Sequence, residues 1–170
     1  DLVPDKVPVN TLHNVLRALL HERVPVKDIV TILETLANAG GASATLDDLV
    51  EKVREALRRT ITALHAEPDG KLHVLSLHPE TEQVLTLAAR DSERAGAVVL
   101  DPRFAQELLQ RLEGALQTAY SQGRPPVLLV PTPIRFFVKR LIEPTYPSLA
   151  VMGYTEVGSA SQVQPASTTT

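Results

Sequence analysis

Cysteine is absent from this sequence of 170 residues, so disulfide bonds and thiolate metal sites are excluded. No stretch approaches the roughly 20 consecutive apolar residues that a membrane-spanning helix needs. Neither glycine-rich phosphate-binding pattern, G-x-x-x-x-G-K or G-x-G-x-x-G, occurs anywhere in the chain. Hydrophobic residues make up 44% and charged residues 22%, as in an ordinary globular protein. The length is sufficient for one domain or two small ones with a real core.

The patterns of common catalytic and metal sites are also missing. There is no G-x-S-x-G motif, and the sequence His21-Glu22 lacks the second histidine of H-E-x-x-H. The acidic pairs Asp47/Asp48 and Glu80/Glu82 are better explained by favourable contact with helix N-termini than by acid–base chemistry. The five histidines are too scattered to form a ligand set: His13, His21, His65, His73 and His78. The sequence therefore predicts a protein that is not an enzyme and that has no cofactor and no metal site.

Residues 10–39 carry the clearest helical pattern. Asn10 is expected to cap a first helix, and Pro25 interrupts it because proline cannot donate a backbone hydrogen bond. Pro25 is then expected in the first turn of a second helix, which Gly40-Gly41 ends. The apolar positions at helical spacing are Leu12, Val15, Leu16, Leu19 and Leu20, followed by Ile29, Ile32, Leu33 and Leu36. The stretch is therefore predicted to form an αα-hairpin.

A third helix is predicted over residues 45–66. Thr45 followed by Asp48 forms a variant capping box at its start. One apolar face is expected to contain Leu49, Val53, Leu57, Ile61 and Leu64. Together with the hairpin and an extended lead-in over residues 1–9, this helix gives a small helical subdomain over residues 1–66.

The turn sequence Glu67-Pro68-Asp69-Gly70 marks an internal boundary, after which the pattern changes. Strands are predicted at Leu72–Leu77, at Pro126–Val130, where the continuous apolar run indicates burial on both faces, and at Leu149–Val157. Helices are predicted after Pro79, Asp101-Pro102 and Thr132-Pro133. Residues 97–100 are either a short strand or an apolar lead-in. The fold class is therefore α/β (α+β overall).

In this interpretation the helical subdomain is followed by a small α/β subdomain over residues 70–157. Its sheet has three strands and contains a parallel β-α-β unit. Residues 158–170 are small and polar, and they are expected to form a disordered tail.

Positive charge gathers in one part of an acidic chain. The whole chain carries 17 − 20 = −3, whereas residues 121–147 carry 4 − 1 = +3. Arg135 and Lys139 are four residues apart and share a helix face. Two interpretations remain open: the solvated outer face of a crossover helix, or a docking surface for acidic partners formed by Arg124, Arg135, Lys139 and Arg140.

Nucleic-acid binding is an alternative, because residues 10–38 have helix-turn-helix proportions. The second helix would have to read the duplex, yet Lys27 is accompanied by two acids, Asp28 and Glu34. This charge pattern is wrong for a surface that contacts phosphates. A purely structural oligomerisation module is a further alternative.

The hairpin sequence from Val15 to Ala37 reads V-L-x-x-L-L, then V-P-x-x-D, then T-I-L-E, with Pro25, Asp28, Thr31 and Glu34 at its centre. This pattern resembles the signature hairpin of the FHIPEP family, the large export-gate subunit of bacterial type III secretion systems in flagella and injectisomes. The resemblance continues through the second half of the chain at Gly123–Val130, Ile134-Arg135, Arg140–Glu143, Pro147–Val151, and Tyr154 with Glu156.

The resemblance implies a specific role. Residues 1–66 would be the third cytosolic subdomain of such a subunit, which takes part in ring contacts, and residues 70–157 the fourth, which borders a partner-docking cleft. The ring is nonameric and lies beneath the membrane channel, at the cytoplasmic face of the inner membrane. It receives complexes of secretion chaperones with their substrates, a gatekeeper and the stalk of the export ATPase.

The family supplies no catalytic residues. Because the chain starts at Asp1, the membrane helices and the first two cytosolic subdomains are expected to precede it in a longer protein. Ring assembly and full partner binding would then require those missing parts.

Overall fold

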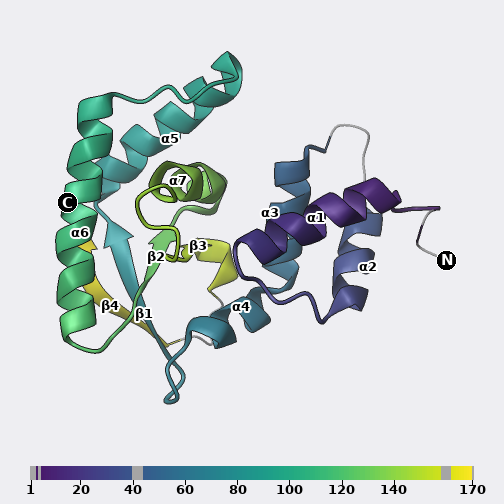
Figure 1. The fold of residues 1–170 in the computed structure, drawn as a ribbon, viewed down its shortest axis with the longest axis horizontal. Coiled ribbons are helices and arrows are strands. Elements are labelled where there is room, and N and C mark those ends of the chain that lie inside the picture. The colour runs from purple at the N-terminus through teal and green to yellow at the C-terminus, as the bar shows by residue number, and fades with distance from the viewer. Residues whose placement is uncertain (1–2, 4, 40–43, 158–161, 170) are drawn as a thin grey trace. The chain divides into compact units, whose positions relative to one another are not determined.

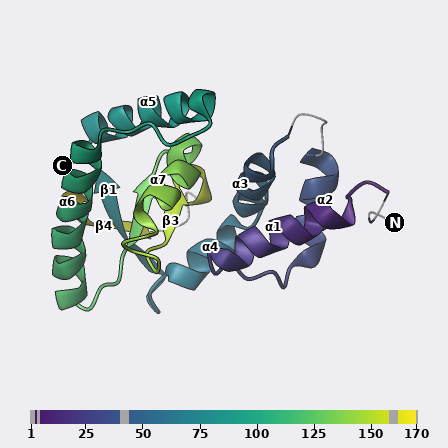
Figure 2. The ribbon, with the colours of Figure 1, turned by 45° about the horizontal axis from the view of Figure 1, so that its top comes forward.

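The computed structural model describes residues 3, 5–39, 44–157 and 162–169. The chain divides into two compact units, which we call unit 1 (Asp1–Leu64) and unit 2 (His65–Thr170). Unit 1 is helical, and unit 2 combines helices with a sheet (Figures 1 and 2). The expected boundary turn at residues 67–70 lies a few residues after this division.

Unit 1 is built from helices α1 (Val9–His21), α2 (Ile29–Ala39), α3 (Leu46–Ala56) and α4 (Arg58–His65), the last of which ends one residue into unit 2. The helices pack through their apolar stripes, as the sequence predicts. The fully buried members of this core include Val15, Leu19, Ile32, Val53 and Ile61.

The connection between α1 and α2 differs from expectation in two places. Asn10 does not cap α1, because the helix already begins at Val9, with Pro8 before it. Pro25 is not in the first turn of α2, which begins only at Ile29. The chain leaves α1 through Arg23 in a left-handed conformation, with φ of 61°, and needs several extended residues before it can turn back into a helix.

The third predicted helix is present but interrupted. Its capping box is confirmed: Thr45 Oγ1 accepts from Asp48 N at 3.2 Å, and Thr45 N donates to Asp48 Oδ2 at 3.2 Å. Leu57 separates α3 from α4, and Leu64 is 49% exposed rather than buried. Leu57, at the break, and Ile61 are both buried, whereas Leu64 near the end of α4 faces outward.

Unit 2 contains a parallel sheet with the order β3-β2-β1-β4. The strands are β1 (Lys71–Leu77), β2 (Val127–Val130), β3 (Val151–Gly153) and β4 (Gln162–Thr169). The first three are predicted strands, although β3 is shorter than the predicted Leu149–Val157 because the chain turns into a 3-10 helix at Tyr154. β2 pairs in parallel with both β1 and β3, which confirms the β-α-β unit. All four residues of β2 are buried, as its continuous apolar run indicates.

The helices of unit 2 are α5 (Pro79–Ala95), α6 (Pro102–Ser121) and α7 (Arg135–Ile142), arranged around the sheet (Figure 1). His78 Nδ1 caps α5 and Asp101 Oδ1 caps α6, each before a proline in the first turn. Thr132-Pro133 starts a short 3-10 turn, Thr132–Ile134, that leads into α7, and residues 97–100 are not a strand. Another 3-10 turn, Tyr154–Glu156, follows β3. The core includes Leu75, Leu85, Leu108, Leu112, Leu128, Ile134, Val138, Ile142 and Val151.

The expected disordered tail, residues 158–170, is described only over residues 162–169, and residues 158–161 and 170 lie outside the described residues. Instead of being disordered, residues 162–169 form β4 and pair in parallel along the full length of β1. The physical reason is the free edge of β1, whose N–H and C=O groups are satisfied by any extended backbone, whatever its side chains. The register skips one residue just after Pro165, which lacks an N–H group for the ladder.

Candidate functional site

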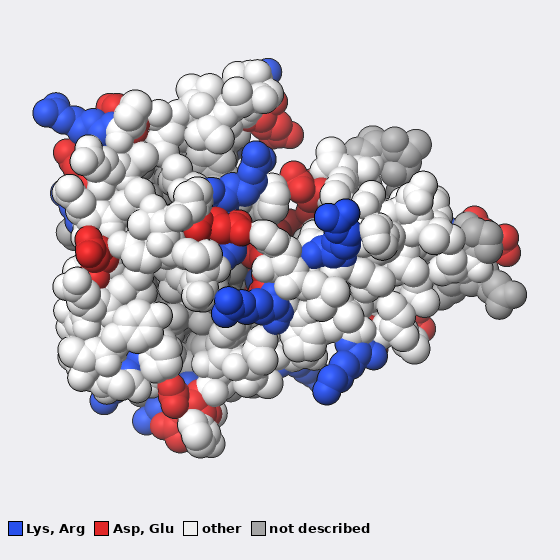
Figure 3. Space-filling model, in the orientation of Figure 1, with Lys and Arg blue, Asp and Glu red and all other residues white. Residues whose placement is uncertain are grey.

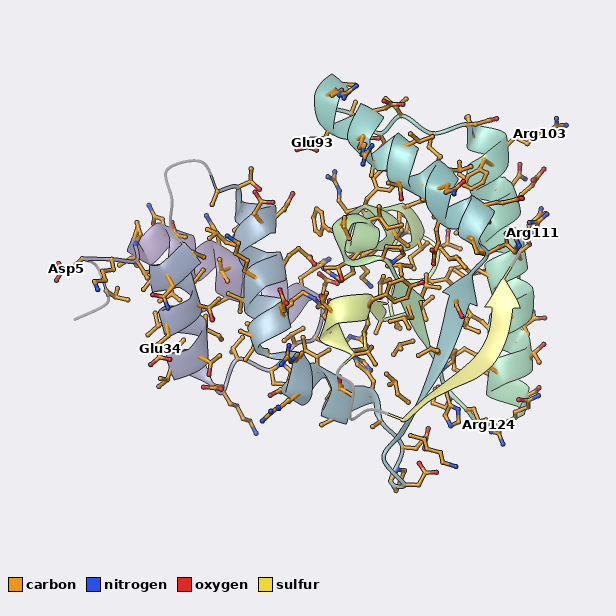
Figure 4. All side chains as sticks on the ribbon, turned by 180° about the vertical axis from the view of Figure 1, so that it is seen from behind. Asp5, Glu34, Glu93, Arg103, Arg111 and Arg124 are labelled. Atoms are coloured by element: carbon orange, nitrogen blue, oxygen red, sulfur yellow. The ribbon has the colours of Figure 1, made fainter. Side chains whose placement is uncertain are left out.

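The basic residues that the sequence singles out in unit 2 do not form one surface. Arg135 begins α7 and is completely buried, and Lys139, one turn later, is 5% exposed. Arg124 and Arg140 are exposed. Figure 4 shows Arg124 just after the end of α6, on the outside of the unit.

The Arg135 side chain holds the end of the sheet together. Its Nη1 donates to the Val151 carbonyl at 3.1 Å, and its Nε lies 3.5 Å from Glu156 Oε1. The same carboxylate oxygen accepts from Gly153 N at 3.3 Å. Glu156 is 1% exposed, so this ion pair is removed from water, and each charge depends on the other for compensation.

Lys139 is satisfied by the main chain. Its Nζ donates to the Pro147 carbonyl at 3.3 Å and to the Leu149 carbonyl at 3.0 Å, in the segment that leads into β3. Both inward cations therefore tie α7 to the backbone around β3 by donating to its main-chain carbonyl groups.

Both interpretations of the Arg135/Lys139 face are wrong, because each required it to face solvent. The spacing of four residues correctly placed the two side chains on one side of the helix, but that side is the inner one. Arg140 lies on the outer side of α7, where its guanidinium carbon is 5.6 Å from the centre of the Phe136 ring. Arg124 and Arg140 remain available to partners as separate positions.

The signature residues of the hairpin have structural roles that the sequence did not specify. Asp28 caps α2: Oδ1 accepts from Thr31 N at 3.1 Å, and Oδ2 accepts from Thr31 Oγ1 at 2.6 Å. Both hydrogen bonds hold the pKa of the Asp28 carboxyl below its ordinary value, and the bond from the Thr31 hydroxyl has the larger effect. Glu34 is exposed and points outward from α2 (Figure 4). Pro25 lies in the connecting segment, three residues before the cap.

A polar contact in unit 2 fixes the turn that follows β3. The Tyr154 hydroxyl donates to Glu82 Oε1 on α5. Partial burial, this hydrogen bond and the Glu82 charge raise the pKa of Tyr154 to about 12. Nearby, Thr132 Oγ1 accepts from Thr155 N at 3.1 Å, and a Cβ on Gly153 would come within 2.7 Å of that oxygen, so the close approach requires glycine.

The candidate site is a hollow of about 700 Å³ on unit 1, which we call the basic hollow. It lies where α2 ends and α3 meets α4. Its lining residues are Thr35, Asn38, Ala39, Lys52, Glu55, Ala56, Arg58 and Arg59. Three bases against one acid give the lining a net charge of 3 − 1 = +2.

All three bases of the basic hollow, Lys52, Arg58 and Arg59, are exposed. Within the part of the chain that the structure describes, none of them is engaged in an ion pair. Arg54, by contrast, is buried beside Glu22, with 3.8 Å between Nη1 and Oε1. The site thus offers three positive charges that no described acidic side chain holds in an ion pair, with Glu55 as the one acid of the lining.

The sequence analysis missed this site, although a signal was present. Lys52, Glu55, Ala56 and Arg59 follow the spacing i, i+3, i+4 and i+7, which places them on one side of the helical stretch. That side is opposite the apolar stripe of Val53, Leu57 and Ile61. What could not be read from the sequence was the approach of Thr35, Asn38 and Ala39 from α2, which turns an exposed face into a hollow.

The helix-turn-helix alternative gains no support. The helix that would read a duplex, α2, has the sequence IVTILETLANA and contains no lysine or arginine. On the face drawn in Figure 3, the basic side chains of the helical unit stand apart from one another and form no continuous positive stripe within that unit. A phosphate-binding surface needs such a stripe.

Among the described residues there is no cluster of histidine and acidic side chains that could hold a metal ion. In the same residues, no helix is both long enough and apolar enough to cross a membrane.

Comparison with known families gives a match along most of the chain. The model of the FHIPEP family matches residues 1–162. The flagellar biosynthesis protein FlhA of Escherichia coli K12 is 35% identical over 168 residues, which cover 99% of this chain and 24% of that protein. The chain thus spans about a quarter of the length of the curated relatives it matches.

Solved structures share the fold of the chain. The Chlamydia pneumoniae CdsV protein superimposes with a TM-score of 0.87 at 27% identity, covering 99% of this chain and 48% of CdsV. CdsV in its complex with CdsO gives the same TM-score and identity, with 49% of CdsV covered. The nonameric cytosolic domain of EscV, from a type III secretion system, matches with a TM-score of 0.71 at 26% identity, covering 96% of this chain and 48% of that domain.

Proposed function

Because the chain belongs to the FHIPEP family of type III secretion export-gate proteins, we propose that it forms part of the cytosolic portion of an export-gate subunit. In this role it has no enzymatic activity. It contributes to a ring at the cytoplasmic face of the bacterial inner membrane, and the longer protein reaches the membrane through segments outside this chain.

The observation that carries this proposal is the extent of the match. The family model covers residues 1–162, and CdsV superimposes on 99% of the chain, so the likeness includes both the helical unit and the α/β unit. A shared α/β fold alone would not define a function, but here the family match and the fold agree over the same residues.

The ring and the partners are proposed from the same relatives. EscV was solved as a nonamer and CdsV in complex with CdsO, which supports a subunit that both self-associates and binds other proteins. In the proposed arrangement unit 1 takes part in ring contacts and unit 2 docks partners. The partners are complexes of secretion chaperones with their substrates, the gatekeeper and the stalk of the export ATPase.

The proposal is tested in the source bacterium by deleting, in frame, the coding segment for these residues. We expect secretion of type III substrates to stop, and a plasmid carrying the complete gene to restore it. A strain that secretes normally after the deletion would overturn the proposed function.

The partner assignment needs a biochemical test. The chain is used as bait in a lysate of the same bacterium, and each captured protein is then purified and titrated against the chain by calorimetry. We expect a secretion chaperone, the gatekeeper or the ATPase stalk to bind directly. Capture of nucleic acid or unrelated enzymes alone would contradict the partner assignment.

A further inference from the structure

We propose that the basic hollow of unit 1 is a binding site for an acidic segment of a partner protein. Its ligand would be a stretch of chain that places two or three carboxylates against Lys52, Arg58 and Arg59. This inference rests on the geometry and charge of unit 1 alone and holds whether or not the export-gate function is correct.

The local charge is opposite to that of the whole chain. The lining of the basic hollow carries +2, whereas the chain carries −3, so the positive lining stands in an acidic background. A concave surface focuses the field of its charges and raises the local concentration of oppositely charged groups. Since no described side chain holds any of the three bases in an ion pair, an acidic ligand would not have to displace an existing one.

The shape of the site favours a protein segment. The hollow of about 700 Å³ is open to solvent, which suits a stretch of chain lying along the surface better than an enclosed small molecule. Asn38 adds an amide that can both donate to and accept from a peptide backbone. Ala39 and Ala56 leave room for the backbone to approach because their side chains are small.

The chemistry disfavours a nucleic acid. Glu55 lies among the three bases and would repel the uniform negative charge of a phosphate backbone. A protein segment avoids this repulsion, since it can place a neutral or basic residue against Glu55. Electrostatic matching of this mixed kind is how protein interfaces gain orientation and specificity.

The site is held in position by the core. Val53, Leu57 and Ile61 are buried on the opposite side of α3 and α4, with exposures of 0%, 2% and 1%. The backbone that carries the three bases is therefore fixed, and only the long side chains need to become ordered on binding. Such preorganisation lowers the entropic cost of association.

The test uses two dye-labelled peptides, one rich in Glu and Asp and one in which every acid is replaced by its amide. Binding to the intact chain is followed by fluorescence anisotropy at low and at physiological salt. We expect the acidic peptide to bind, with affinity falling as salt rises, and the amide peptide to bind at least about tenfold more weakly.

Charge reversal locates the binding site. The double variant Arg58→Glu with Arg59→Glu should weaken binding of the acidic peptide by at least about tenfold. Both positions are exposed and lie in the first turn of α4, where acids interact favourably with the helix dipole, so folding should be preserved. Thermal melts followed by circular dichroism check this.

The matched control makes the same charge change elsewhere. Arg90→Glu with Arg103→Glu alters two exposed arginines of unit 2, and Figure 4 shows Arg103 at the start of α6, on the outside. The affinity of this control variant for the acidic peptide should change by less than about threefold, since the two altered charges lie outside the basic hollow. Glu55→Gln should strengthen binding, because it removes the one repulsive carboxylate.

Three results would overturn the proposal. The first is that the acidic peptide does not bind. The second is that both double variants lose affinity for the acidic peptide equally. The third is that a DNA duplex binds as tightly as the acidic peptide and loses binding in the same variant. None of these outcomes bears on the deletion experiment, so the two proposals fail separately.

Discussion

The two units use their basic side chains in opposite ways. In unit 2, Arg135 and Lys139 point inward and fasten α7 to the backbone around β3. In unit 1, Lys52, Arg58 and Arg59 point outward and surround the basic hollow. The same residue types therefore hold the fold together in one unit and create a binding surface in the other.

The difference has a clear physical origin. A cation can be buried only where a carboxylate or several carbonyl groups replace its water, and unit 2 supplies both around the end of β3. Around the junction of α3 and α4 the described residues supply no such partners for three of the bases. Arg54 shows the same rule within unit 1, because it is buried where Glu22 accompanies it.

Among the variants that test this comparison, Arg135→Ala is expected to have the largest effect on stability. The variant removes the Arg135 guanidinium from beside the buried Glu156 carboxylate, which should cost about 3–5 kcal/mol of unfolding free energy. Hydrogen exchange resolved by mass spectrometry should show faster exchange in unit 2 and little change in unit 1. Arg140→Ala, at an exposed position on the same helix, is the control, with an expected cost below about 1 kcal/mol. Equal costs for the two variants would mean that the inward ion pair does not stabilise unit 2.

In unit 1 the corresponding experiment tests apolar packing instead of a buried ion pair. Ile32 is fully buried and Leu33 is half-buried, so Ile32→Ala should cost about 2–5 kcal/mol and Leu33→Ala clearly less. The sequence alone gave no basis for ranking these two neighbours. Urea unfolding of both variants decides the order, and a larger cost for Leu33→Ala would contradict the packing of α2.

A smaller effect is expected at the helix cap. Asp28→Ala removes both hydrogen bonds to Thr31 and should lower the urea-unfolding midpoint of unit 1 by a small amount, less than Ile32→Ala does. Asp28→Asn can still accept at the cap, so it should retain most of the stability. If the two variants are equally destabilised, the charge of Asp28 matters more than its hydrogen bonds.

The smallest effect concerns titration in unit 2. The pKa of Tyr154 is raised to about 12, because burial, the hydrogen bond to Glu82 and the Glu82 charge all favour the neutral phenol. Its contribution to stability is therefore complete below pH 10 and is lost as the pH rises towards 12. Glu82→Gln should lower the pKa of Tyr154 towards its ordinary value. Tyrosinate absorbance during an alkaline titration measures this, with Tyr154→Phe identifying the signal, and an unchanged titration would contradict the contact.

Local signals in the sequence predicted several elements correctly. The Thr45/Asp48 box, the Asp101-Pro102 start of α6 and the apolar run of β2 depend on residues close together in the chain, and all three are confirmed. The parallel pairing of β1, β2 and β3 was also predictable, because a helix between two strands leaves little other choice, whereas β4 was not predicted. The length of the connection before α2 could not be predicted, since Pro25 fits either a helix start or an extended segment.

The sequence by itself determined the order of the main elements, the caps at Thr45 and Asp101, and the family signature from Val15 to Ala37, because each of these depends on short-range geometry. Tertiary structure decided which side of α7 faces inward, where the tail pairs, and where a binding surface forms. These outcomes depend on groups distant in sequence: Glu156 for Arg135, the free edge of β1 for β4, and the end of α2 for the basic hollow. A helical spacing places two side chains together, but only the packing of the rest of the chain determines whether they meet water or a carboxylate.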